Sequence, residues 1–166
     1  MHLLRTLAAG AALLAFAGAA EAGEQYVDGS GFAVSGYDVV AYGSLAQVGT
    51  GRPQPAAVKG SQEFKATYNG ATWLFANAEN RDAFLADPAR YAPAYDGHCA
   101  YGVGKGGKVP GNPNLWRIVD GKLYLNINRQ VVGFWEADIP GNVAAAEQNW
   151  PGLEPAPAST KDVPNF

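Results

Sequence analysis

Two stretches of the chain share one pattern, a β-hairpin followed by a helix. Residues 64–75 are rich in β-branched and aromatic residues on either side of Asn69-Gly70, a dipeptide that favours the positive φ angles of a tight hairpin turn. Residues 116–125 repeat the pattern around Asp120-Gly121. The sequence therefore predicts two antiparallel hairpins.

A helix is expected after each hairpin, and another near the end of the domain. Asn77 and Asn128 are good N-caps because a side-chain oxygen there accepts a free backbone N–H, and Pro140 is typical of a first helical turn. Apolar residues then recur at helical spacing, at Phe84, Pro88 and Tyr91, at Val131, Val132 and Trp135, and at Val143, Ala146 and Trp150. We therefore expect a single α+β domain, a small antiparallel sheet built from the two hairpins with helices packed on it.

The first 22 residues have the pattern of a secretory signal peptide. Arg5 gives a short basic start, residues 6–19 are apolar, and Ala20-Glu21-Ala22 is a small-x-small cleavage site. The apolar stretch is too short to span a bilayer, which takes about 17–25 residues, and no other segment approaches that length. Cleavage before Gly23 predicts a periplasmic or secreted protein without a membrane span.

The rest of the chain divides into three parts. Residues 23–36 are Gly-rich and irregular, residues 37–150 hold the hairpins and helices, and residues 151–166 form a Pro-rich tail that we expect to be loose. Hydrophobic residues are 48% of the 166, so there is apolar area for a core. The formal net charge of −3 provides no basic face for nucleic acid, which we exclude as a partner.

Removal of residues 1–22 leaves one histidine, His98, and one cysteine, Cys99, next to each other. These two residues alone cannot form an internal disulfide or complete a structural zinc site. Three interpretations stay open: a reactive thiol whose pKa an adjacent imidazolium lowers, a copper or zinc ion held between turned side chains, or a buried core cysteine beside a structural histidine. An extended backbone would point the two side chains to opposite faces and disfavour a catalytic dyad.

The glycine-rich stretch after this dipeptide matches a phosphate-binding pattern only in part. Residues 102–107 satisfy G-x-G-x-x-G, but Pro110 and Pro113 follow too soon for the long helix that such a loop precedes. Val109 also stands where a P-loop needs Ser or Thr to hold Mg²⁺. We therefore expect a flexible surface loop here.

Three motifs follow one another along the first hairpin and its helix: Tyr68-Asn-Gly70, Trp73-Leu-Phe75 and Phe84-Leu-Ala-Asp87-Pro88-Ala-Arg-Tyr91. Together they resemble the signature of the YHS domain. Further motifs lie on either side: Gly36-Tyr-Asp-Val-Val-Ala-Tyr42, His98-Cys99-Ala-Tyr101, Trp135-Glu-Ala-Asp-Ile-Pro-Gly141 and Asn149-Trp-Pro151. With these, residues 34–152 resemble the exported YHS domain-containing (seleno)protein family.

The resemblance gives different implications for metal binding and for thiol chemistry. Metal-binding YHS domains carry cysteines at the positions of Ala41, Ala76 and Asn80, so their thiolate metal site does not carry over to this sequence. In the exported family the position of Cys99 is sometimes selenocysteine, which implies thiol redox chemistry there. The resemblance assigns no reaction, because a shared fold does not fix one.

The leading hypothesis is an exported domain whose Cys99 is a redox-active or metal-capturing thiol, with His98 tuning it and a small thiol, copper or zinc as its ligand. Tyr95, Asp96 and Tyr101 are expected to support this site. The alternative is a non-catalytic binding or structural module of the cell envelope that docks a partner protein. The sequence leaves open whether the protein is an enzyme.

Overall fold

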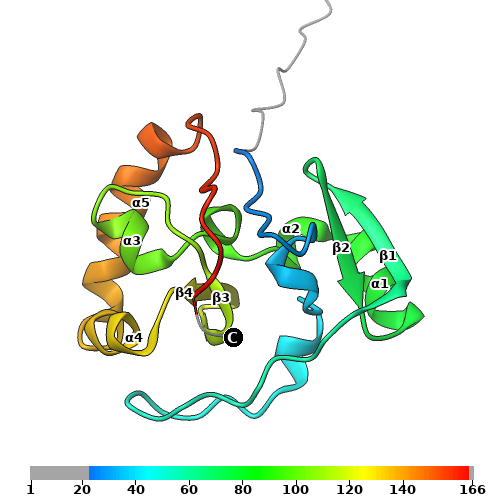
Figure 1. Cartoon of the computed structure of the whole chain (residues 1–166). Helices are drawn as coiled ribbons and strands as arrows, with labels where there is room; N and C mark the ends of the chain where they lie inside the picture. The colour runs from blue at the N-terminus through cyan, green and yellow to red at the C-terminus, as the bar shows by residue number, and fades with distance from the viewer. Residues whose placement is uncertain (1–22, 165–166) are drawn as a thin grey trace, which may run out of the picture.

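The computed structural model describes residues 23–164, and the predicted signal peptide, residues 1–22, lies outside them (Figure 1). The helices and strands in chain order are β1 (Ser61–Tyr68), β2 (Ala71–Phe75), α1 (Ala78–Ala86), α2 (Pro88–Tyr91), α3 (Ala100–Gly104), β3 (Asn112–Val119), β4 (Lys122–Asn126), α4 (Arg129–Glu136) and α5 (Ile139–Leu153). Short 3-10 turns stand at η1 (Val34–Gly36), η2 (Ala41–Ser44) and η3 (Ala94–Gly97). Within residues 23–164, no helix combines the length and the apolar character that crossing a bilayer requires.

Both predicted hairpins are present, and the α+β class is confirmed. β1 pairs with β2, and β3 with β4, both antiparallel. Their turns use the positive φ angles that the dipeptides favour, 47° at Asn69 and 49° at Asp120, each followed by a glycine.

The expectation of one shared sheet was wrong, because the described strands form two separate two-stranded sheets. The hairpins meet through side chains instead: Trp73 and Phe75 of β2 pack in one hydrophobic cluster with Trp116 and Leu125. The strands of one hairpin thus form no ladder with those of the other, and the contact between them is hydrophobic. Each hairpin therefore presents a face, and not an edge, to the other.

Strand β4 separates two hydrophobic clusters of the described residues. Successive side chains of a strand point to opposite faces, so Leu123 and Leu125 lie in the cluster with the first hairpin. Tyr124, between them, lies in a second cluster with Trp135 of α4 and Ala146 of α5. The β3–β4 hairpin thus lies between the cluster that contains the first hairpin and the cluster that contains α4 and α5.

The helix starts follow the sequence signals. The Oδ1 atom of Asn77 accepts the N–H of Asn80 at 2.8 Å, and that of Asn128 accepts the N–H of Val131 at 2.9 Å. Asp138 caps α5 in the same way, with Pro140 in the first turn. Local capping chemistry therefore sets these boundaries.

The glycine-rich stretch that we expected to be a flexible surface loop contains the packed helix α3 instead. Ala100 and Val103 are fully buried against α5. Gly104 allows this packing, since a Cβ there would lie 3.3 Å from the carbonyl oxygen of Asn142 in α5, and a Cβ at Gly102 would lie 2.6 Å from Cγ2 of Val109. Gly102 and Gly104 thus serve close approach of the backbone to its neighbours, whereas a Cβ at Gly106 or Gly107 would meet nothing within 4 Å.

The C-terminal segment, which we expected to be loose, lies against the N-terminal segment (red beside blue in Figure 1). α5 continues through Pro151 to Leu153. Beyond it, the Tyr26 hydroxyl donates to the carbonyl of Lys161 at 2.6 Å, and Asp162 accepts the N–H of Gly29 at 2.8 Å. Hydrogen bonds to the backbone hold this segment, which is why low apolar content did not leave it loose.

Candidate functional site

His98 and Cys99 follow one another on an extended backbone between η3 and α3, and both side chains are fully buried. The extended conformation points them in different directions, as the sequence analysis anticipated. Each has its own hydrogen-bond partners, and none of the hydrogen bonds among the described residues joins the two side chains. The geometry does not assemble a His98–Cys99 dyad.

Cys99 is the N-cap of α3. Its sulfur accepts the N–H of Gly102 at 3.4 Å, and its S–H donates to Oδ1 of Asn126 at 3.5 Å. Burial raises the pKa of the Cys99 thiol and outweighs the opposing effect of neighbouring backbone N–H groups. The sulfur is therefore a protonated thiol that is sealed from water.

His98 is neutral in this structure. Its Nδ1–H donates to the carbonyl of Tyr95 at 2.8 Å, which leaves Nε2 to accept the N–H of Ser159 at 3.1 Å. Burial lowers the pKa of His98 to about 4. An imidazolium that lowers the pKa of Cys99, as the sequence hypothesis required, is absent at neutral pH.

The neighbours expected to support the thiol have other roles. The Tyr95 hydroxyl donates to Glu147 at 3.1 Å, and Asp96 faces the N-terminal segment. Tyr101 donates its backbone N–H to Oδ1 of Asn126, the same atom that receives the thiol proton of Cys99. Asn126 is thus the residue that joins β4 to the cap of α3. The sequence analysis did not select it, because its one signal is that a polar residue ends an apolar strand.

No group of three or more His, Cys, Asp and Glu side chains able to hold a metal ion occurs in residues 23–164. At the dipeptide, a copper or zinc ion would have to displace Ser159 from His98 and the thiol proton from Cys99. The structure therefore offers no preformed ligand set there.

The positions that correspond to the thiolate ligands of metal-binding YHS domains converge on Asp38, which is fully buried. Its Oδ1 accepts the N–H of Ala41 at 3.2 Å, while Oδ2 accepts the N–H of Ala76 at 2.8 Å and the Nδ2–H of Asn80 at 2.7 Å. Alanine and asparagine stand at the cysteine positions, and their N–H groups bind the Asp38 carboxyl oxygens. These residues do not fit a thiolate metal centre.

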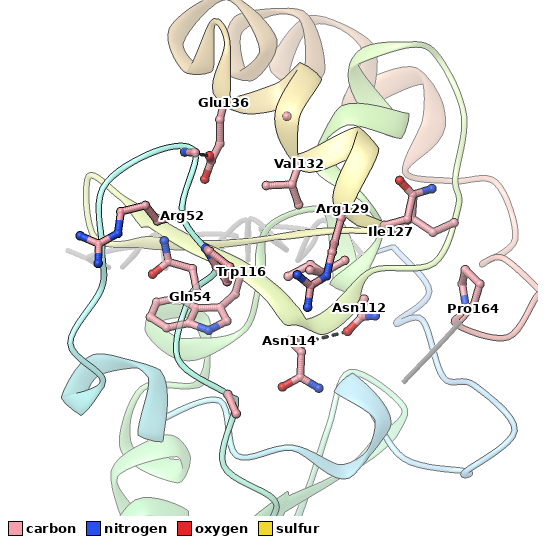
Figure 2. A pocket seen from close by; sticks show the side chains of 16 residues that line it. Arg52, Gln54, Asn112, Asn114, Trp116, Ile127, Arg129, Val132, Glu136 and Pro164 are labelled. Atoms are coloured by element: carbon pink, nitrogen blue, oxygen red, sulfur yellow. Dashed lines mark hydrogen bonds between the residues drawn. The ribbon is translucent and has the colours of Figure 1, made fainter.

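A pocket of about 810 Å³ opens elsewhere, where the loop 51–56 faces β3 and the start of α4 (Figure 2). Trp116 and Asn112 of β3 line it together with residues 127–129 at the β4–α4 junction. Figure 2 shows Arg129 reaching beside Trp116 and Asn112, with Arg52 on the other side of Trp116. The volume falls in the range of about 300–1,000 Å³ typical of small-molecule sites.

The charges around this pocket are unbalanced. Glu136 is neutralised by a buried ion pair with Arg117, and it also accepts the N–H of Gly51 at 2.6 Å, which fastens the loop. Arg52 and Arg129, both exposed, have no ion-pair partner among residues 23–164. The pocket therefore carries an excess of positive charge.

Asn112 adds an unused donor. The residue is 3% exposed, and its Oδ1 accepts the N–H of Asn114 at 2.9 Å. No hydrogen bond among residues 23–164 uses its Nδ2, which is not one of the buried atoms that lack a partner and so is accessible to solvent or a ligand. Sequence reasoning missed this pocket because its lining comes from four separated parts of the chain, residues 51–56, 112–116 and 127–136 and Pro164, most of them ordinary surface residue types.

Comparison with known proteins finds the YHS domain model in residues 54–95. No curated protein and no solved structure matches the chain. The matched residues include the first hairpin with α1 and α2, and end just before the dipeptide of His98 and Cys99. The chain therefore contains a YHS domain, in residues 54–95.

Proposed function

We propose that the protein is a non-catalytic binding module that holds a small ligand with an anionic group in the pocket between loop 51–56, β3 and α4. One observation carries this proposal: two arginines without ion-pair partners and the unused amide of Asn112 surround the pocket. Unpaired polar groups around a cavity are the usual sign of a binding site.

The chemistry of the lining defines the ligand class. A guanidinium binds a carboxylate or phosphate with two parallel hydrogen bonds, so Arg129 and Arg52 favour a planar or tetrahedral anion. The positive end of α4, whose cap is Asn128, adds to that preference. Val132, Ile127 and Trp116 offer apolar contacts to the rest of the ligand. A small organic carboxylate fits these features.

Matched pairs of acids and amides test the proposal. We expect phenylacetate and hexanoate to shift NMR signals of the pocket residues, and phenylacetamide and hexanamide to shift them much less. Arg129→Gln and Arg52→Gln should each weaken carboxylate binding about tenfold, because each removes a charge-assisted contact. Arg90→Gln, which removes the same charge from α2 outside the pocket, should leave binding unchanged. Equal binding of acids and amides would overturn the proposal.

Export to the periplasm or beyond is part of the proposal. It is supported by the basic start, the apolar run and the Ala-x-Ala site of residues 1–22. The intact mass of the protein purified from a bacterial cell envelope should correspond to a chain that begins at Gly23. Recovery of the full-length chain in the cytoplasm alone would contradict export.

A thiol redox or metal-capturing role at Cys99 is the second candidate. Backbone N–H groups of Gly102, Ile127 and Tyr101 act to lower the thiol pKa against the effect of burial, so the surroundings suit a thiolate once water enters. This role requires α3 to open. Full copper or zinc binding by the Cys99→Ser variant would exclude Cys99 as a ligand, and loss of binding would support it.

A further inference from the structure

Gly23 lies between two carboxyl groups. Its backbone N–H donates to Oε1 of Glu154 at 3.3 Å. A Cβ at this position would clash with Oδ2 of Asp96 and lie 2.8 Å from Cγ of Glu154. The residue is buried, and a side chain here would run into both acidic side chains, so the place requires glycine.

Asp96 has an unused oxygen at this place. Its Oδ2 is buried and has no hydrogen-bond partner among the described residues. Burial, followed by the nearby charge of Glu154, raises the pKa of Asp96. The backbone at Asp96 is also strained, with a φ of 52°. A buried carboxyl oxygen without a hydrogen-bond partner lowers the stability of the fold unless a cation binds it.

The nearest cations are directed elsewhere. Lys108 donates its ammonium to the backbone carbonyls of Glu154 and Ala156, at 3.0 and 2.6 Å. Lys122 donates to the carbonyl of Ala89 at 3.3 Å. Both lower the pKa of Asp96 from a distance, but neither forms an ion pair with it. The missing partner of Asp96 must come from another group.

The position of Gly23 is well fixed. Asn69 donates its Nδ2–H to the carbonyl of Gly23 at 2.8 Å. Two residues of the same segment bind the backbone of Asp96, since Tyr26 N–H and Gln25 Nε2–H both donate to its carbonyl at 2.8 Å. The nitrogen of Gly23 is therefore held beside both acids by contacts that do not involve residues 1–22.

We propose that cleavage of the Ala22–Gly23 bond completes this site, and that the new N-terminal ammonium of Gly23 forms an ion pair with Asp96 and Glu154. A signal peptidase adds one water across the peptide bond, so Ala22 leaves as a carboxylate and Gly23 becomes an amine. The amine takes a proton at neutral pH, because an α-amino group has a pKa of about 7.7–8.0. The amide of the uncleaved chain donates one hydrogen bond, whereas the ammonium donates three and carries a charge.

This inference rests on the proposed export, and it makes the stability of the fold depend on processing. In the uncleaved chain, Asp96 and Glu154 repel each other without a bonded cation. In the processed chain, the same groups hold the N-terminus against the end of α5. The contribution of Asp96 to stability should therefore change sign on cleavage.

The test compares Asp96→Asn and Glu154→Gln in the processed protein and in the full-length chain isolated before processing. In the processed protein, both substitutions should lower the thermal midpoint. In the full-length chain, they should leave it unchanged or raise it. The control Glu63→Gln removes an exposed carboxylate of β1 and should behave alike in both forms.

A second measurement does not depend on variants. The N-terminal amine of the folded processed protein should react with an amine-specific acylating reagent at least tenfold more slowly than that of the peptide Gly-Glu-Gln. Equal acylation rates, or equal effects of Asp96→Asn in the two forms, would overturn the ion pair. If the mature chain nevertheless begins at Gly23, the proposed export is unaffected by that result. A mature N-terminus at any other residue would overturn both.

Discussion

The dipeptide of His98 and Cys99 and the pocket beside Trp116 differ in whether their polar groups are satisfied. At the dipeptide, both ring nitrogens and the thiol have partners, and both side chains are sealed from water. Around the pocket, the described residues provide no ion-pair partner for Arg52 or Arg129 and no acceptor for Nδ2 of Asn112. The sequence draws attention to the dipeptide, because it holds the one histidine and the one cysteine that follow residue 22. The structure draws attention to the pocket, because polar groups there lack partners. Substitutions in the first should cost stability, and those in the second should cost binding.

The largest expected effect is the protection of Cys99. In the native protein, its reaction with Ellman's reagent should be about a thousandfold slower than in urea-unfolded protein, because the sulfur is reached only after opening of the surrounding structure. The rate constant under native conditions checks this. A native rate close to that of the unfolded chain would remove the contrast between the two regions and revive the reactive-thiol hypothesis.

Substitution of Asp38 should have the next largest effect. Asp38→Ala leaves the buried N–H group of Ala41 and the partly buried N–H groups of Ala76 and Asn80 without an acceptor, at a cost of about 4 kcal/mol in the free energy of unfolding. Asp38→Asn retains one oxygen and should cost less. Urea denaturation measures both, with and without added zinc. A loss that zinc restores would mean that the site binds metal after all.

A pH titration of stability tests whether His98 is neutral. Its pKa in the folded protein is about 4, against 6.5 for an unperturbed histidine, so only the unfolded chain takes the proton between these values. Stability present above pH 6.5 should fall by up to about 3 kcal/mol as the pH is lowered to 4. In His98→Gln this part of the slope should vanish, which separates it from the opposite contribution of Asp96 in the uncleaved chain. An unchanged slope in the variant would contradict the assignment.

The smallest effect on stability should come from the pocket. Arg129→Gln removes an exposed charge without an ion-pair partner in the described residues, and should change the free energy of unfolding by less than about 0.5 kcal/mol. The same variant is expected to bind carboxylates about tenfold more weakly, so stability and binding separate. A stability loss comparable to that of the Asp38 variants would assign Arg129 a structural role.

Much of the secondary structure could be predicted because its causes are local. Asn69-Gly70 and Asp120-Gly121 determine their turns by their own φ preferences, and Asn77 and Asn128 determine helix starts by one hydrogen bond each. The chain need not be folded for these preferences to act. The hairpins and caps are therefore the most accurate part of the sequence analysis.

The site could not be predicted in the same way, because burial and pairing depend on distant segments. Nε2 of His98 accepts the N–H of Ser159 in the C-terminal segment, and the thiol of Cys99 donates to Asn126 on β4. Likewise, the excess charge of the pocket follows from Glu136 being neutralised by Arg117, which no local pattern shows. Sequence spacing gave the candidates, but only the fold decides which of them are already satisfied.

The division of β4 between two clusters bears on how the chain can be cut. Trp73 and Phe84, inside residues 54–95, share one hydrophobic cluster with Trp116, Leu123 and Leu125, which lie outside that range. A fragment trimmed to the matched borders would leave its aromatic face in water and should aggregate or stay unfolded. The unit that sequence comparison recognises is thus smaller than the unit that folds, and expression of the isolated match is a poor way to study it.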